Sequence, residues 1–421
     1  MTKTANTANT AQPEVTAEAI RTAHDAMHAA SSVIRTPSVG SPYLAGVLGG
    51  DSQVVLKLEN QQITSSFKAR GSFTRMAKLN DDEAKHGVIT MSAGNHAQAV
   101  AYHAYRLGIP AVIVMPAQTP FAKINRTRAW QAEIILEGRN LNECEGKVAE
   151  VIKQRHMTLV HPYNDVEVIT GQGSVGVEML ADTPDLDTLI VPIGGGGLIA
   201  GIAIVAKAIN PKIKIYGVEA ELWPTMTAVM AGKTPEGKGE TLAEGIAVKQ
   251  PGKLTAPYVK NLVDEILLVS EANIEKAVGL MVEQQRLVVE GAGAAGVAAL
   301  LQHPAKFKNR KCGVVICGGN IDPRLLSAVL TRNMARDGRI ARLRVDISDE
   351  PGMLAAISGA IGDCKANVIE VFHQRMFQDV PPKLAKIDAV VETRGKDHLD
   401  EVVAEIKSRG FTVTVLSDTS K

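Results

Sequence analysis

The chain has 421 residues, a formal net charge of +1 and 4% aromatic residues. This length accommodates two or three domains with substantial hydrophobic cores. The near-neutral charge and the low aromatic content argue against nucleic acid or an anionic membrane as a partner. No apolar run reaches the length of a membrane span. Because Cys144, Cys312, Cys317 and Cys364 show neither metal-type nor disulfide-type spacing, we predict a cytoplasmic protein.

Residues 1–15 are polar and of low complexity, and they lack the apolar region of a secretory signal, so we predict a disordered tail. From residue 16 to about 335, short apolar segments alternate with helix-period stretches. This alternation is typical of an α/β domain whose helices cover both faces of parallel sheets. The strands form two blocks, which predicts two subdomains around a cleft, the smaller (about 66–160) inserted in the larger. The expected strands are 52–58, 88–91, 111–115, 133–136, 159–160, 188–193, 213–218 and 313–316.

The sequence changes character after about residue 335. The expected elements are a strand at 342–347, a helix at 351–361 opened by Asp349, strands at 367–376 and 386–392, a helix at 397–409 and a strand at 411–416. The order β-α-β-β-α-β predicts a ferredoxin-like α+β domain at 341–421. Residues 379–382 are expected to form a turn between its middle strands.

Four consecutive glycines, Gly194, Gly195, Gly196 and Gly197, join a predicted strand to a predicted helix. Such a loop can direct several backbone N–H groups at one anion, and the helix dipole adds to the attraction. No Lys-Ser/Thr pair follows, so the segment is not a nucleotide P-loop. Two alternatives stay open at this point: a simple tight turn, or a dinucleotide fingerprint in which Glu219 binds a ribose.

Lys68 lies in the segment Ser65-Ser66-Phe67-Lys68-Ala69-Arg70-Gly71, at the start of a predicted helix. Most lysines are solvated surface charges, but the helix dipole disfavours a cation here and favours the neutral amine that forms a Schiff base. An amine and a phosphate cradle are together the two attachments that pyridoxal phosphate needs.

Two further segments join a strand to a polar or glycine-rich turn. In the first, Ser92-Ala93-Gly94-Asn95-His96, Ser92 is expected to cap a helix whose free N–H groups suit a carboxylate. The alternative is a plain cap with surface polar residues. In the second, Cys317-Gly318-Gly319-Asn320, the cysteine could equally be a buried small hydrophobic residue.

These four motifs, in this order and spacing, resemble the pyridoxal-phosphate enzymes of the tryptophan-synthase-β fold, called fold type II. Within them the chain is similar to the threonine dehydratase (threonine ammonia-lyase) family. The segment Asp349-Glu350-Pro351-Gly352-Met353-Leu354 resembles the start of an ACT regulatory domain, so residues 341–421 are expected to be one such domain. The resemblance implies pyridoxal 5′-phosphate as cofactor and displaces the dinucleotide alternative.

The resemblance also implies a role for each matching residue. Lys68 would carry the cofactor as a Schiff base and then move the Cα proton of the substrate. Cofactor contacts are expected from Phe67 to the ring, Asn95 to the phenolic oxygen and Gly194, Gly195, Gly196 and Gly197 to the phosphate. The substrate carboxylate is expected at Ser66, Ser92, Asn95 and His96, and Gly245 is expected to face the amino acid.

Cys317 takes the position of the ring-nitrogen partner, which is usually a serine in this family. A thiol is a weak donor that does not protonate a pyridine nitrogen, which favours elimination over transamination or racemisation. Ala93 stands where related serine racemases carry a serine, so little racemisation is expected. Some relatives bind a cation through a carboxylate matching Glu219. The later carboxylate of that pattern is replaced by Trp223-Pro224-Thr225, so a purely structural Glu219 is the alternative.

The predicted activity is the deamination of L-threonine to 2-oxobutanoate and ammonia, with L-serine as a slower substrate. The alternatives are an L-serine or 3-hydroxyaspartate ammonia-lyase and, from another class, an amino-acid sensor with a vestigial catalytic core. An amino-acid effector such as isoleucine or valine is expected near Pro351 and Gly352, and a homo-oligomer is expected by analogy with ACT domains.

Overall fold

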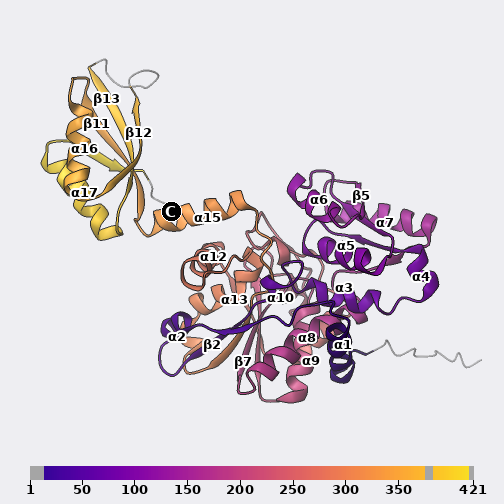
Figure 1. The fold of residues 1–421 in the computed structure, drawn as a ribbon. Helices are drawn as coiled ribbons and strands as arrows, with labels where there is room; N and C mark the ends of the chain where they lie inside the picture. Colours follow the sequence, from indigo (N-terminus) through magenta and orange to yellow (C-terminus); the bar gives the residue numbers. More distant parts are fainter. Residues whose placement is uncertain (1–13, 375–382, 417–421) are drawn as a thin grey trace, which may run out of the picture. The chain divides into compact units, whose positions relative to one another are not determined.

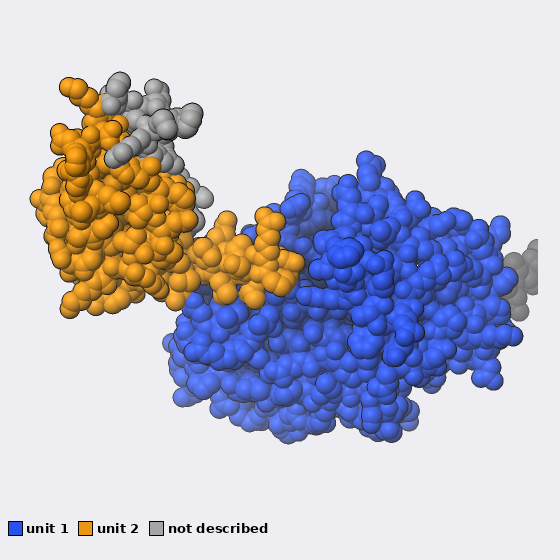
Figure 2. Space-filling view, turned by 45° about the horizontal axis from the view of Figure 1, so that its top comes forward, with its two compact units in different colours: residues 1–321 blue, residues 322–421 orange. Residues whose placement is uncertain are grey.

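The computed structural model describes residues 14–374 and 383–416, apart from the side chains of residues 141 and 142. The chain divides into two compact units, Met1–Ile321 and Asp322–Lys421, which Figure 2 shows in different colours. Val15, which was predicted to belong to the tail, is buried, and its N–H donates to the Tyr258 hydroxyl at 2.9 Å. Most of the predicted tail and the turn expected at 379–382 lie outside the described residues. Within the described ranges, no helix is both long and apolar enough to cross a bilayer.

The first unit contains a six-stranded sheet in the order β1-β2-β10-β7-β8-β9. Only the pairing of β1 with β2 is antiparallel, and the other neighbours are parallel. The four strands predicted here are confirmed within a few residues. The sequence did not predict β1 and β9. A strand of three residues, such as β1, is too short to show an alternating apolar pattern. The strands are β1 (Ser38–Gly40), β2 (Gln53–Lys57), β7 (Thr188–Pro192), β8 (Lys214–Ala220), β9 (Glu265–Val269) and β10 (Lys311–Val315).

A second, four-stranded parallel sheet has the order β5-β4-β3-β6. Alternate residues of its strands face opposite sides, as the pleat requires. Val88 and Ile113 pack in the core that includes α5, whereas Ile89 and Val112 pack in the core that includes α7. The chain leaves the large sheet after β2 and returns to it at β7, so the predicted pair of parallel-sheet subdomains is confirmed. The strands are β3 (Val88–Met91), β4 (Ala111–Met115), β5 (Glu133–Leu136) and β6 (Thr158–Leu159).

Helices cover both sheets (Figure 1). In the large sheet, α13 contacts β7, β8, β9 and β10, while α9 contacts β7 and packs on α8. The crossing of α8 and α9 requires glycines, because a Cβ at Gly201 would lie 2.6 Å from the Gly173 nitrogen. The helices of this unit are α1 (Ala17–Ala29), α2 (Pro42–Leu48), α3 (Lys68–Met76), α4 (Asp81–His86), α5 (Asn95–Leu107), α6 (Phe121–Arg128), α7 (Leu141–Arg155), α8 (Val166–Asp182), α9 (Gly197–Ile209), α10 (Thr225–Met230), α11 (Thr255–Leu262), α12 (Glu271–Gln285), α13 (Gly291–Gln302) and α14 (Pro304–Phe307), with 3₁₀ turns η1 (Glu59–Gln61) and η2 (Glu244–Ile246).

A fully buried cluster of charges ties α3, α8 and β2 together. The Arg70 guanidinium donates to both Glu59 oxygens at 2.8 Å and to both Glu178 oxygens at 2.7 and 3.0 Å. The Lys57 ammonium donates to Glu178 at 2.6 Å and to the Thr36 carbonyl at 2.6 Å. Two buried cations therefore face two buried carboxylates, and each charge has a partner of opposite sign.

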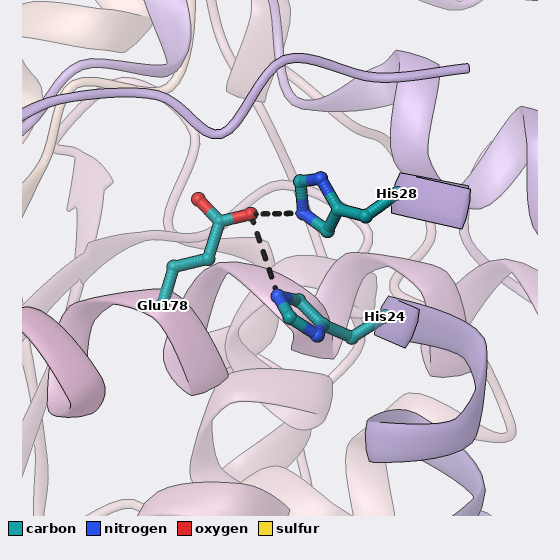
Figure 3. Close-up of side chains that lie close together, drawn as sticks. All are labelled: His24, His28 and Glu178. Atoms are coloured by element: carbon teal, nitrogen blue, oxygen red, sulfur yellow. Dashed lines mark hydrogen bonds and ion pairs between the residues drawn. The ribbon is translucent and has the colours of Figure 1, made fainter. Parts of the chain in front are cut away.

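Two histidines of α1 extend this cluster toward the surface (Figure 3). His28 Nε2 lies 2.9 Å from Glu178 Oε1, and His24 Nε2 lies 3.9 Å from the same oxygen. In the described part of the chain, these three residues are the only group of His, Cys, Asp or Glu with a metal-like arrangement. The charges of Arg70 and Lys57 on Glu178 oppose a cation there, so we describe the group as an ion-pair network.

The second unit contains the four-stranded antiparallel sheet β12-β13-β11-β14. The predicted ferredoxin-like α+β order is confirmed, and the described boundaries lie within two residues of the predicted ones. The expectation that Asp349 opens the first helix was wrong, because Gly352, at φ +94°, is the N-cap of α16. The elements are α15 (Pro323–Arg336), β11 (Ile340–Ser348), α16 (Met353–Asp363), β12 (Asn367–Gln374), β13 (Leu384–Glu392), α17 (Lys396–Ser408) and β14 (Thr412–Val415). The domain boundary near residue 335 stays a prediction.

Candidate active site

A cavity of about 290 Å³ lies in the first unit, where the ends of β3, β7 and β10 meet the starts of α3, α5 and α9. Ligand sites of α/β proteins lie at this edge of the sheet, because several loops and helix N-termini converge there. The structure brings most of the predicted site residues together on its lining. They are Phe67, Lys68, Ser92, Asn95, His96, Gly194, Gly195, Gly196, Gly197, Gly245 and Cys317.

Lys68 is the first residue of α3, as predicted. Its ammonium donates to the Pro162 carbonyl at 2.7 Å and lies 5.1 Å from the centre of the Phe67 ring. Burial lowers the pKa of Lys68 to about 8, against opposing effects of Cys317 and Glu290. The direction agrees with the sequence argument, but burial is the leading cause, where the sequence argument invoked the helix dipole. A large fraction of this amine is neutral near pH 8, the form that attacks a carbonyl.

Ser66 is fully buried, and its hydroxyl has no hydrogen-bond partner. Its backbone pairs with Gly318, and the Phe67 N–H donates to the Cys317 carbonyl at 3.2 Å. These bonds hold the segment that contains Lys68 against the turn after β10. Ser66 is therefore adjacent to the cavity residues without being part of their lining.

The glycine loop runs from the end of β7 into α9, where Gly196 is the N-cap at φ +91°. A Cβ at Gly195 would overlap the Tyr163 ring, and a Cβ at Gly196 would lie 2.6 Å from Thr255 Oγ1. Only glycine therefore lets the backbone pass between these side chains. The N-terminus of α9 faces the cavity, which suits an anion such as phosphate.

The segment from Ser92 to His96 leads into α5, which begins at Asn95. The expectation that Ser92 caps this helix was wrong. The N-cap is Gly94, and the Ser92 hydroxyl accepts from the Gly94 N–H at 3.2 Å, inside the turn that precedes the helix. The N–H groups at the helix start stay available for a carboxylate, in line with the second part of the expectation.

His96 is buried in the neutral form. Its Nε2–H donates to the Val160 carbonyl at 2.8 Å, and its Nδ1 has no partner. Burial lowers the pKa of His96 to about 3, and the charge of Lys68 lowers it further. The free ring nitrogen is thus an acceptor. If His96 receives a carboxylate, it does so through its backbone N–H and not through its ring.

Cys317 is buried beside Lys68 and Glu290. Burial raises the pKa of the Cys317 thiol well above its ordinary value, and the negative charge of Glu290 adds to the shift. The side chain is therefore a neutral thiol, a weak hydrogen-bond donor without ionic character.

Comparisons with known proteins agree with this geometry. The family described as "Pyridoxal-phosphate dependent enzyme" matches residues 30–318. The chain belongs to this family. It is 40% identical over 401 residues to an L-threonine ammonia-lyase from Thermotoga maritima, covering 95% of this chain and 98% of that protein.

Solved structures lead to the same family. Maize serine racemase superposes with a TM-score of 0.71 at 34% identity, covering 76% of this chain and 98% of that one. Threonine deaminase isoform 2 from Solanum lycopersicum superposes with a TM-score of 0.70 at 32% identity, covering 75% of this chain and 87% of that one.

The residues of the cavity fit pyridoxal phosphate. Lys68 lines the same cavity as the glycine loop, where a Cβ at Gly195 or Gly196 would collide with neighbouring side chains. Ser66 and His96 add buried polar atoms without protein partners, as expected where a ligand supplies the missing bonds. The individual roles predicted for these residues stay predictions.

Glu219 lies at the end of β8 but outside the cavity lining. Its carboxylate accepts from the Met226 and Thr227 N–H groups at 2.7 and 2.9 Å and from the Thr227 hydroxyl at 2.7 Å. It thus caps the start of α10, which supports the structural alternative. Burial raises the pKa of Glu219, with the hydrogen bonds from Thr227 and Met226 opposing the shift. A cation at Glu219 stays a prediction.

Sequence reasoning missed several residues of the cavity. Glu290 and Tyr163 lie in segments without a recognisable motif, and Asn320 was quoted within a motif without a role. Lys123 of α6 and Glu244 of η2 form an ion pair of 2.7 Å at the cavity. A signal for Glu290 existed in the small residues Gly291, Ala292 and Gly293 that follow it, since they permit close backbone approach.

Proposed function

We propose that the protein is a pyridoxal-phosphate-dependent L-threonine ammonia-lyase that converts L-threonine to 2-oxobutanoate and ammonia, with L-serine as a slower substrate. The observation that carries the proposal is that the Lys68 amine and the glycine loop line one cavity, where burial lowers the pKa of Lys68. The similarity to the Thermotoga maritima L-threonine ammonia-lyase along 95% of this chain supports the choice of substrate.

Pyridoxal phosphate, when bound, supplies an electron-withdrawing ring that stabilises negative charge at Cα of an amino acid. The glycine loop and the N-terminus of α9 would hold its phosphate. The N–H groups at the start of α5 would orient the substrate carboxylate, and Lys68 would accept the Cα proton. The neutral Cys317 thiol would leave the ring nitrogen unprotonated, which favours loss of the β-hydroxyl over racemisation. Ala93, which lines the cavity, offers no hydroxyl acid to the opposite face of the substrate.

The test compares kcat/KM for L-threonine, L-serine and 3-hydroxyaspartate, with release of ammonia and the 2-oxo acid as the readout. We expect threonine to lead. Replacement Lys68→Ala should lower turnover by at least about 10²-fold, as expected on loss of a catalytic base. Reduction of the wild type with borohydride should attach the cofactor to Lys68. A preference for serine or hydroxyaspartate would select the corresponding lyase, and an inactive chain that still binds amino acids would select the sensor.

We further propose that the second unit binds an amino-acid effector such as isoleucine or valine near Pro351 and Gly352, and that the protein is a homo-oligomer. The positive φ of Gly352 at the start of α16 supports a turn shaped for backbone contacts. A cytoplasmic location is supported by the four free cysteines. Threonine assays with and without isoleucine test the effector, and the mass in solution tests the assembly.

A further inference from the structure

Glu290 places a carboxyl group inside the cavity although no sequence motif pointed to it. It precedes α13 as its N-cap, and its backbone N–H donates to the Gly318 carbonyl at 3.1 Å. Its side chain does not cap the helix. Instead, Glu290 Oε1 accepts from Asn95 Nδ2 at 2.7 Å. A Cβ at Gly318 would overlap that carboxyl oxygen, so the glycine after Cys317 makes room for Glu290.

The carboxamide of Asn95 is held from both ends. Asn95 Oδ1 accepts from Asn320 Nδ2 at 2.6 Å, and Asn320 Nδ2 also donates to the Thr64 carbonyl at 2.9 Å. If the Asn95 amide were flipped, its nitrogen would face the Asn320 nitrogen, so two donors would meet. Its oxygen would face an ionised Glu290 oxygen, so two acceptors would meet. The network therefore selects one orientation of the amide. An amide nitrogen has two N–H bonds, so one goes to Glu290 and the second is free for a ligand.

The proton on Glu290 affects one end of this network. Burial raises the pKa of Glu290 to about 7, with the hydrogen bond from Asn95 opposing the shift. The other charged or titratable groups that act on it are Lys68 of α3, Lys123 of α6, Glu244 of η2 and Cys317 after β10. A protonated carboxyl could donate to a flipped Asn95 oxygen, so the preference for one orientation is strongest when Glu290 is ionised, whereas Asn320 opposes the flip in either state.

We propose that Glu290 is a positioning residue that fixes the carboxamide of Asn95, so that its second N–H is directed to the ring oxygen of the bound cofactor. The proposal rests on the proposed function through the identity of the cofactor. It adds a residue that acts through Asn95.

The test is a double-mutant cycle on the cofactor-free full chain titrated with pyridoxal phosphate, with the visible absorbance as the readout. The variants are Glu290→Ala, Glu290→Gln, Asn95→Ala and the double alanine variant. Glu290→Ala should weaken binding about tenfold or more, the value of a hydrogen bond to a charged group. In the Asn95→Ala background the same change should have less than about a twofold effect, because the residue through which it acts is gone.

Glu290→Gln separates geometry from charge. Its amide oxygen can accept the same Asn95 N–H, so affinity should fall less than in Glu290→Ala. Any wild-type change of the cofactor absorbance between pH 6 and 8 that comes from Glu290 should disappear in the glutamine variant. If Glu290→Ala does not fold, the glutamine variant and its Asn95→Ala double complete the cycle.

Equal effects of the Glu290 change in both backgrounds, or wild-type affinity and pH response in both Glu290 variants, would overturn the proposal. Glu265→Ala is the control, because Glu265 forms an ion pair of 2.6 Å with Lys306 at the surface. The titration uses no amino-acid substrate. Lack of activity on threonine would therefore refute the proposed function while the cycle still reports on Glu290.

Discussion

Two buried polar regions of the first unit are built in opposite ways. In the cluster around Arg70, Lys57, Glu59 and Glu178, every charge faces an opposite charge within 3 Å. At the cavity around Lys68, His96 Nδ1 has no partner, and neither has the hydroxyl of Ser66, which lies beside the cavity residues. A saturated network has nothing left to offer a ligand, whereas an unsaturated one gains bonds only when a ligand binds. The four charged residues of the cluster are paired with one another, whereas His96 Nδ1 in the cavity lining has no protein partner.

The largest expected effect tests the saturated cluster. Replacement Glu178→Gln leaves Lys57 and Arg70 buried with one carboxylate fewer, so we expect a loss of about 3–5 kcal/mol in the free energy of unfolding. Urea unfolding followed by tryptophan fluorescence reports on this unit alone, because Trp130 and Trp223 are the two tryptophans of the chain. The matched control Glu265→Gln, at an exposed ion pair, should cost no more than about 1 kcal/mol. Equal losses of stability in both variants would contradict the distinction between the buried charge cluster and an exposed ion pair.

A smaller effect is expected in the glycine cradle. Replacement Gly195→Ala forces the Tyr163 ring to move and strains its 2.9 Å bond to the Gln250 carbonyl. Overpacking of this kind costs about 1–3 kcal/mol, and we expect cofactor affinity to fall as well. Gly46→Ala in α2 is the control, since its Cβ would meet nothing within 4 Å. If Gly195→Ala and Gly46→Ala have the same unfolding midpoint and the same cofactor affinity, steric contact with Tyr163 does not explain the glycine at position 195.

The smallest expected effect is a difference in pH dependence between Glu178 and Glu290. Burial raises the pKa of Glu178, but the hydrogen bonds and charges of Arg70 and Lys57 outweigh it and lower that pKa to about 2. Its contribution to stability is therefore complete above the ordinary value of 4.5 and is lost as pH falls toward 2.

The contribution of Glu290 to stability changes with pH in the opposite direction. Burial raises its pKa from 4.5 to about 7, so the folded state holds a proton that the unfolded state has lost, and stability falls as pH rises from 4.5 to 7. Cofactor-free Glu290→Gln should gain stability relative to the wild type between pH 5 and pH 8, by about 1 kcal/mol, less than the full shift would give because Glu290 is only partly buried. Unfolding midpoints at the two pH values provide the measurement, and a relative loss at pH 8 would reverse the assignment.

The sequence was sufficient where the physical signal is local. The β-branched runs of β3, β4 and β5 predicted strands with the observed bounds, because each is an apolar segment between turn residues. The helix start at Lys68 and the strand-loop-helix order around the four glycines were likewise local patterns. The order β-α-β-β-α-β in the second unit was predicted from the alternating pattern of its strands and the helical pattern of the segments between them.

Local patterns failed where long-range contacts decide. Ser92 has the composition of a cap, but the helix begins at Asn95, and the Ser92 hydroxyl serves the preceding turn. Glu219 resembles a cation or ribose ligand at a strand end, yet its oxygens are used by the start of α10. No local motif identifies Glu290, because Asn95, with which it forms a hydrogen bond, lies 195 residues away in the chain.

The sequence by itself determined the element types, the ferredoxin-like order of the second unit and the residue kinds that bind a phosphate and an aldehyde. These depend on periodicity and backbone freedom, which each short segment carries within itself. Only the tertiary structure decided that burial is the main cause of the lowered pKa of Lys68, which carboxylates are paired with cations and which polar atoms have no partner. Desolvation and pairing are properties of what surrounds a group in space, and segments distant in the chain supply those surroundings.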